Sequence, residues 1–425
     1  MKHLGRLAGA CLITTLLIAC GGGSNGFNAP TSIAPPPAAS LWFARQPHTS
    51  GAEQVLHNFK GGKDGANPAP VLLDVKGALY GTTVNGGGSG CGGAGCGTVF
   101  KVGVSGKGYR VLYRFKGNTD GANPVGVIDV KGALYGTTSG GGGSGCGGGG
   151  CGSAFTVGVS GKGYRVLYSF KGGTDGASPD SIINVNGALY GATYGGDVPT
   201  DYGTVFVMNS STGSESVLYN FKGGTDGAYP AYAPIDANGT LYGTTTGGDV
   251  SSDHGTVFAM SSSSGSESVL YNFKGGTDGA TPYLVIDVDG VIYGATNNGG
   301  KSCNCGTVFR VNSSTGAERV LYSFKGGTDG AYPTSTIDVS GELYGATTTG
   351  GASGNGTVYG VNSKSGAESI LYSFKGGTDG AYPGNGLTDV NGALYGTTVV
   401  GGGGTACKPI SSFPSGCGTV FKLTP

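Results

Sequence analysis

Seven aspartates, each followed by glycine, recur along this chain and are its most conspicuous candidates for chemistry. They are Asp64, Asp120, Asp175, Asp226, Asp278, Asp329 and Asp379. A set of carboxylates could bind a divalent cation or accept hydrogen bonds from a sugar, but an aspartate before glycine also caps its own backbone in an Asx-turn. Because every copy carries the aspartate, we favour the turn. No complete D-x-[DN]-x-[DN]-G calcium loop occurs, and we expect neither a metal nor a cofactor.

Tyrosine follows the Asp-Gly-Ala segment in three of the seven copies, as Tyr229, Tyr332 and Tyr382. These rings could stack on sugars, although filling the space between repeats is the interpretation we favour. Together with the seven aspartates they form the candidate binding face.

Eight cysteines beyond residue 20 fall into local pairs. The pairs are Cys91 with Cys96, Cys146 with Cys151, Cys303 with Cys305, and Cys407 with Cys417. In an exported chain this spacing predicts disulfides, worth about 2–3 kcal/mol each by the loop-entropy argument. The Cys303–Cys305 ring is so small that bonding there is left open. Zinc is the alternative, since Cys-x4-Cys supplies half of a structural site, but no complementary histidine cluster exists.

Catalytic constellations are scarce. Beyond residue 19 the chain has only His48, His57 and His254, and no nucleophile-elbow motif lies near them. Hydrolysis of a glycoside needs two facing carboxylates. Five glutamates stand just before the last strand of a repeat, and we expect them on the face opposite the Asp-Gly loops as solvated turn residues: Glu53, Glu215, Glu267, Glu318 and Glu368. We therefore assign no catalytic residue.

The elements that position these groups belong to one repeat. A Leu-Tyr-x-Phe-type segment occurs seven times at intervals of 56, 55, 51, 52, 51 and 50 residues, and such a period indicates a repeat architecture. Its phenylalanines are Phe59, Phe115, Phe170, Phe221, Phe273, Phe324 and Phe374. The 92 glycines recur in register and are typical of turns that need positive φ.

Each period contains four short segments rich in β-branched and aromatic residues, and Asn-Gly or Asp-Gly often joins the first two as a hairpin. Seven such units predict an all-β, seven-bladed β-propeller of four-stranded antiparallel blades. The first copy starts at its last strand, near Val55, and the final copy stops after its third, near Leu423. We predict that the N-terminal strand completes the C-terminal blade, which removes two exposed edges. An open solenoid is the alternative.

The segments Leu-Tyr-Gly-x-Thr, Gly-Thr-Val-Phe and Leu-Tyr-x-Phe-x-Gly-x-x-Asp-Gly resemble the GloVer tandem repeat of bacterial surface proteins with differing anchors. The resemblance covers residues 52–425, and one copy departs from it with Gly152-Ser-Ala-Phe155. It implies an exported, anchored repeat protein and brings no established activity or catalytic residue.

The N-terminal region carries targeting signals. A basic start and a short apolar stretch predict a signal peptide over residues 1–19, and Leu17-Ile-Ala-Cys20 resembles a lipobox, which implies lipidation at Cys20. An ordinary cleaved signal is the alternative. Residues 20–50 read as a Gly/Ser/Pro-rich tether and residues 51–425 as the propeller.

The charge balance is even, with 25 basic and 25 acidic residues, so we expect no nucleic-acid partner. The interpretation is a non-catalytic protein of the bacterial cell envelope, at the outer membrane or cell surface. It would be held to the membrane by a lipid anchor and would bind a glycan or a protein through the candidate binding face, which loops form. A polysaccharide-active enzyme with a site in the central channel and a purely structural envelope protein are the alternatives.

Overall fold

The computed structural model describes residues 51–195, 201–230, 232–247, 253–384, 386–407 and 415–425. Residues 50–425 form one compact unit, and residues 1–49 are counted as a separate one. The predicted signal peptide, the predicted lipidation site Cys20 and the predicted tether lie outside the described residues. In the described part of the chain no helix is long and apolar enough to cross a membrane.

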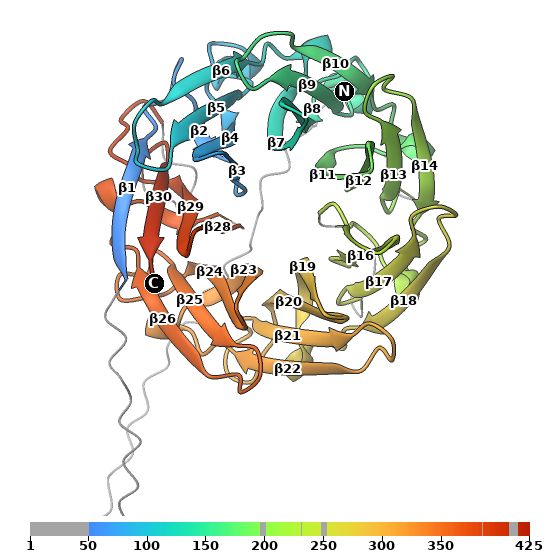
Figure 1. The fold of residues 1–425 in the computed structure, drawn as a ribbon, viewed down its shortest axis with the longest axis vertical. Coiled ribbons are helices and arrows are strands. Elements are labelled where there is room, and N and C mark those ends of the chain that lie inside the picture. The colour runs from blue at the N-terminus through green and yellow to red at the C-terminus, as the bar shows by residue number, and fades with distance from the viewer. Residues whose placement is uncertain (1–50, 196–200, 231, 248–252, 385, 408–414) are drawn as a thin grey trace, which may run out of the picture. The chain divides into compact units, whose positions relative to one another are not determined.

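The described residues after position 50 form seven antiparallel sheets arranged around a ring, which confirms the predicted propeller (Figure 1). Blades I to III contain β2 (Ala66–Pro68), β3 (Leu73–Val75), β4 (Ala78–Asn85), β5 (Thr98–Gly103) and β6 (Arg110–Arg114); β7 (Ala122–Val130), β8 (Ala133–Gly140), β9 (Ser153–Gly158) and β10 (Arg165–Ser169); and β11 (Pro179–Val185), β12 (Ala188–Thr193), β13 (Thr204–Asn209) and β14 (Glu215–Asn220).

Blades IV to VI repeat this order. They contain β15 (Ile235–Ala237), β16 (Thr240–Thr245), β17 (Thr256–Ser261) and β18 (Glu267–Asn272); β19 (Ala280–Val288), β20 (Val291–Asn298), β21 (Thr307–Asn312) and β22 (Glu318–Ser323); and β23 (Ala331–Val339), β24 (Glu342–Thr349), β25 (Thr357–Asn362) and β26 (Glu368–Ser373). The first strand of each blade is innermost and the last is outermost (Figure 1).

Blade VII closes the ring as predicted. It combines β27 (Ala381–Pro383), β28 (Thr388–Val390), β29 (Ala393–Val400) and β30 (Thr419–Thr424) with the N-terminal β1 (Ala52–Asn58). Strand β1 pairs antiparallel with β30, from Ala52 opposite Thr424 to Asn58 opposite Thr419. This pairing covers the edge of β30 and excludes the open solenoid.

The helical segments of the described residues are short 3-10 turns in the loops. Two lie in Gly-rich loops, η1 (Cys91–Gly93) and η3 (Cys146–Gly148). Six lie in the connections between blades: η2 (Asn118–Asp120), η4 (Gly173–Asp175), η5 (Gly224–Asp226), η6 (Gly276–Asp278), η7 (Gly327–Asp329) and η8 (Gly377–Asp379).

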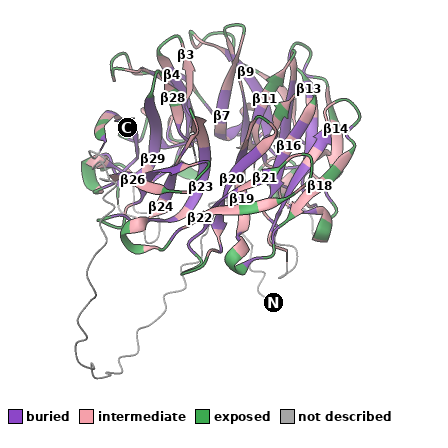
Figure 2. Ribbon diagram, turned by 60° about the horizontal axis from the view of Figure 1, so that its bottom comes forward, coloured by how far each residue is buried: buried purple, intermediate pink, exposed green. Residues whose placement is uncertain are grey.

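The core lies between neighbouring blades, where buried residues line the facing sheets (Figure 2). At each interface the repeat phenylalanine after an outer strand meets an aromatic ring on the third strand of the next blade. Their centroids are 4.9–5.3 Å apart in edge-to-face geometry. The glycine of Leu-Tyr-Gly makes room for that ring: a Cβ on Gly81 would lie 2.7 Å from Cζ of Phe100.

Buried hydroxyl pairs join the second and third strands of every blade. In blade I the pair is Thr83 with Thr98, whose oxygens are 2.8 Å apart. In blade II, where the repeat motif departs to Gly-Ser-Ala-Phe, Ser153 keeps the hydroxyl and lies 2.9 Å from Thr138. The departure therefore preserves the bond that the buried position requires.

Candidate functional site

The crossing loops between blades and the Gly-rich loops between second and third strands share one face of the ring, called here the loop face. Backbone hydrogen bonds tie the two sets together. The N–H of Gly87 donates to the carbonyl of Gly62 at 2.6 Å, and Gly142 donates to Asn118 at 2.6 Å. Equivalent bonds occur in blades V, VI and VII. The loops therefore support one another.

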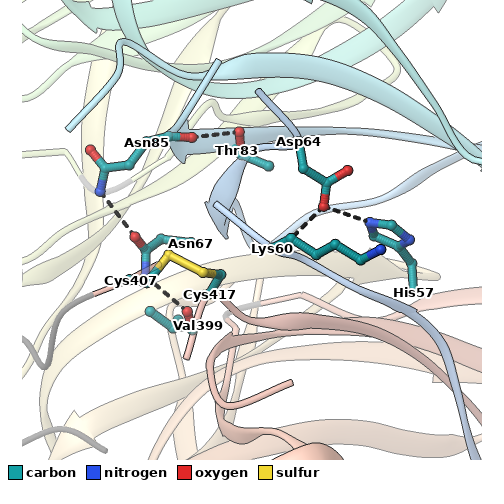
Figure 3. The surroundings of a disulfide bond; sticks show 9 residues. All are labelled: His57, Lys60, Asp64, Asn67, Thr83, Asn85, Val399, Cys407 and Cys417. Carbon is teal, nitrogen blue, oxygen red and sulfur yellow. Dashed lines mark hydrogen bonds and ion pairs between the residues drawn. A yellow bond between two sulfur atoms is a disulfide. The ribbon is translucent and has the colours of Figure 1, made fainter. Parts of the chain in front are cut away.

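Each of the seven aspartates organises its own crossing loop. The backbone N–H of the lysine four residues earlier donates to Asp Oδ2 at 2.6–2.9 Å. In six copies the tyrosine seven residues earlier donates its hydroxyl to Oδ1 at 2.6–2.7 Å. In the first copy His57 takes this place, and its Nε2 lies 3.3 Å from Oδ2 of Asp64 (Figure 3). These bonds account for the aspartates by loop geometry.

The four predicted cysteine pairs are bonded as disulfides, including Cys303 with Cys305. Their sulfurs pack against glycines of the crossing loops. A Cβ on Gly117 would lie 3.1 Å from Sγ of Cys96, and one on Gly61 would lie 3.2 Å from Sγ of Cys417. Close to the latter disulfide, the Asn67 amide donates to the carbonyl of Val399 at 3.0 Å (Figure 3). The disulfides thus hold the Gly-rich loops against the crossing loops.

Three Gly-rich loops lack a disulfide and place another side chain at the position of the second cysteine. These side chains are Tyr202, His254 and Asn355. The His254 ring packs on the crossing-loop glycine as the sulfurs do elsewhere, since a Cβ on Gly275 would lie 2.6 Å from its Nε2. His254 is therefore explained as a packing residue.

The three candidate tyrosines occupy a left-handed backbone conformation. The φ angles of Tyr229, Tyr332 and Tyr382 are 59°, 61° and 56°. Two of the other copies place Asn67 and Asn123 at the same position, and asparagine tolerates this conformation better than tyrosine does. Each tyrosine N–H donates to a carbonyl in the preceding Gly-rich loop, at 2.7–2.9 Å.

One of these tyrosines belongs to an aromatic cluster, called here the tyrosine cluster: Tyr194, Tyr202 and Tyr229. The rings of Tyr194 and Tyr229 are stacked with centroids 5.1 Å apart, and Tyr202 meets Tyr229 at 6.2 Å. Tyr194 is 37% exposed. Sequence reasoning named Tyr229 but missed Tyr194, because the two residues are 35 positions apart and the chain's crossing into the next blade brings their rings together.

The expectation that the five glutamates lie opposite the Asp-Gly loops as solvated turn residues is wrong. They are half-buried, with one carboxylate oxygen enclosed, and stand beside the aspartate and tyrosine of the preceding blade. Strand β14, which Glu215 begins, contacts η4 and thus the loop of Asp175. The outer strands run along the rim of the ring, so the start of one lies beside the end of the previous one (Figure 1).

This placement changes the ionisation of the glutamates. Burial and the Asp175 carboxylate raise the pKa of Glu215 to about 7, and burial and Asp379 do the same for Glu53. Burial and the corresponding aspartates also raise the pKa of Glu267 and of Glu318 to about 7. Burial and the same aspartates raise the pKa of the interface tyrosines above its ordinary value.

The Gloeobacter/Verrucomicrobia repeat matches residues 40–252 and 248–425, which together cover the whole propeller. This chain belongs to that repeat family. No curated protein matches it. Among solved structures, a puromycin hydrolase is similar with a TM-score of 0.53 at 10% identity, over 79% of this chain and 50% of that one. An oligogalacturonate lyase in complex with manganese has a TM-score of 0.51 at 11% identity, over 88% and 90% of the two chains. At these identities the likeness shows the fold alone.

The predicted aspartates and cysteines of this repeat protein belong to the crossing loops or the Gly-rich loops that form the loop face, and the predicted tyrosines lie where the crossing loops end. The aspartates and cysteines stabilise the loops, whereas the tyrosines add aromatic surface. The described residues contain no group of three or more His, Cys, Asp or Glu arranged to hold a metal. The disulfides indicate an oxidising compartment outside the cytoplasm.

Proposed function

We propose that this protein is a non-catalytic, lipid-anchored binding protein of the bacterial cell envelope that binds carbohydrate through the tyrosine cluster of its loop face. The observation that carries the proposal is a tyrosine kept in a left-handed conformation within an exposed aromatic cluster. The remaining support comes from the rigidity of the surrounding loops and from the export signals in the sequence.

The backbone conformation of Tyr229 argues for a use of its ring. A left-handed conformation costs a non-glycine residue about 1–2 kcal/mol, and asparagine is among the residues that reduce this cost. Other copies use asparagine at the same position, as in Asn67. A tyrosine retained there supplies what asparagine cannot, a flat apolar face with a hydroxyl at its edge. Such a face suits the C–H side of a sugar ring.

The loops around the cluster are held in place before any ligand arrives. The N–H of Tyr229 donates to the carbonyl of Tyr202 at 2.7 Å, and the N–H of Gly203 donates to Asp201 Oδ1 at 3.1 Å. Binding to a preorganised surface avoids much of the entropy cost of ordering loops. Loops on a rigid scaffold are also where binding usually resides.

The expected location of the protein in the cell envelope supports a ligand outside the cytoplasm. The lipobox around Cys20 implies an anchor, and four disulfides agree with an oxidising environment. A non-catalytic role fits the aspartates, whose carboxylate oxygens are used within their own loops.

A glycan array tests the proposal. The full mature protein, purified in a nonionic detergent, is applied with and without a chelator, alongside Y229N and T281N. Thr281 is also in the left-handed conformation, with φ of 57°, so T281N relieves the same strain without removing a ring. We expect a specific glycan signal that Y229N loses and T281N keeps.

The other outcomes are equally informative. A signal lost on chelation would show that binding needs a metal ion and would favour the hypothesis that the aspartates hold a cation. A blank array in both conditions would reject carbohydrate and direct the search to a protein partner. A signal that Y229N retains would remove the tyrosine cluster as the site.

A further inference from the structure

Three residues that occur in only one copy of the repeat meet at a single blade interface, between blades VII and I. His57 stands where the six other copies have tyrosine, and Lys63 stands where they have threonine. Arg114 stands where they have serine or asparagine. His57 and Arg114 are 57 positions apart in sequence, so the packing of one repeat on the next brings these departures together.

The contacts at this interface are specific. The His57 and Tyr109 rings are stacked at 3.5 Å with 8° between their planes, and the Tyr109 hydroxyl donates to the carbonyl of Asp64 at 2.5 Å. The Asp64 carboxylate lies between His57 and the backbone N–H of Lys60 (Figure 3). Arg114 Nε donates to the backbone carbonyl of Lys63 at 3.0 Å, which uses one of its five N–H groups.

An open cavity of about 380 Å³ lies over these contacts and is called here the seam cavity. It is lined by Lys63, Asp64, Tyr109, Arg110, Val111 and Arg114. Three cationic side chains and one carboxylate leave two net positive charges. Burial acts to raise the pKa of Asp64, but the hydrogen bonds from His57 and Lys60 outweigh it and lower that pKa, so Asp64 is ionised and partly neutralised by its own partners.

The side chains around this cavity carry a net positive charge, whereas most other interfaces add a second carboxylate to the aspartate. Five interfaces place a glutamate beside the aspartate, whereas Tyr109 takes the glutamate position here. The neighbouring interface, between blades I and II, provides an internal comparison. It has the same ring stack, Tyr113 on Tyr164 at 3.7 Å, but carries Thr119 and Ser169 in place of Lys63 and Arg114. The excess positive charge is therefore no requirement of the fold.

We propose that the seam cavity is an oxyanion-binding site, which takes a carboxylate, sulfate or phosphate group of a ligand. Arginine suits such groups because its planar fork can donate two parallel hydrogen bonds, and lysine adds a mobile charge. The ring of Tyr109 and the side chain of Val111 give the cavity an apolar wall beside its cations. This site is distinct from the tyrosine cluster and does not depend on the carbohydrate proposal.

Titration calorimetry at low ionic strength tests the site with three probes: sodium glucuronate, sulfate and inorganic phosphate. The full mature chain in nonionic detergent is compared with K63T/R114S, which installs the residues of the neighbouring interface. We expect one equivalent of at least one anion to bind, with at least about tenfold weaker binding in the variant, because charge-assisted hydrogen bonds are lost. Raising the salt to 0.15 M is expected to weaken binding.

Two further variants separate binding from a structural role of Arg114. K63T keeps the backbone carbonyl that Arg114 contacts, so it should weaken binding while the thermal midpoint stays unchanged. T119K/S169R should create a second site and raise the stoichiometry from one to two. The probe that binds identifies the source: glucuronate indicates an acidic sugar, and phosphate or sulfate an esterified ligand. No saturable heat with any probe, or equal affinity in K63T/R114S, would overturn the proposal.

Discussion

Raising the pH from 5 to 8 is expected to destabilise the propeller, because the interface glutamates prefer their neutral form when folded. Glu53, Glu215, Glu267 and Glu318 each have a pKa of about 7 against an ordinary value of 4.5. A raised folded-state pKa gives stability that is fully present below the unfolded pKa and is lost as the pH rises through the folded one. The loss therefore falls between about pH 4.5 and 7.

The structure sets the size of this effect. A difference of about 2.5 pKa units corresponds to about 3.4 kcal/mol for a fully shielded carboxyl. These glutamates are only half-buried, so solvent screening reduces the figure to about 1 kcal/mol each. They lie at four separate blade interfaces, and their contributions should add to about 4 kcal/mol. Asp180, whose pKa burial raises to about 6, contributes with the same sign.

Urea unfolding at pH 5 and pH 8 measures the difference. The variant E53Q/E215Q/E267Q/E318Q/E368Q should lose most of the pH dependence and be more stable than the parent at pH 8. E342Q is the control, because Glu342 lies at an inner hairpin, where it accepts a hydrogen bond from the Asn362 amide at 3.3 Å. The reasoning would be refuted if the parent protein were equally stable at both pH values. It would also be refuted if the variant with all five substitutions kept the parent's pH dependence of the free energy of unfolding.

Three further results are expected. F206A removes a fully buried ring that meets Phe170 at 5.1 Å, and should lower the free energy of unfolding by about 3–5 kcal/mol in denaturant titration. C407S/C417S opens a loop of sequence separation 10 and should cost about 2–3 kcal/mol, which treatment of the parent with a reductant should reproduce or exceed. C20A should abolish labelling by a radioactive fatty acid and release the protein from membranes; continued labelling would contradict the lipid anchor.

The ring and its closure could be predicted because they depend on periodicity. Every copy presents strands, turns and the Phe59-type aromatic at the same offsets, and the incomplete first and last copies supply each other's missing strand. Three of the disulfides could also be predicted, since each pair is local, whereas the small ring between Cys303 and Cys305 left that bond open. These features follow from residue spacing along the sequence, so predicting them does not require knowing which side chains of neighbouring blades meet.

The glutamates and the seam cavity could not be predicted in the same way, because they depend on contacts between repeats. Glu215 belongs to the motif of its own blade, yet its neighbour is Asp175, 40 positions earlier and across a blade interface. Only the course of the outer strands along the rim brings the two carboxyl groups together. The same course makes Arg114 a neighbour of Lys63.

In a protein of near-identical copies, a recurring polar group is first explained by the fold, and function is sought in the departures. The seven aspartates recur and are used by their own loops. A single departure is weak evidence, as His254 shows, since it fills a position that cysteine fills elsewhere. His57, Lys63 and Arg114 are different, because three departures converge at one interface, where Lys63 and Arg114 line the seam cavity. The neighbouring interface of similar geometry has none of the three. Convergence in space of residues unique in sequence is the stronger sign of a site.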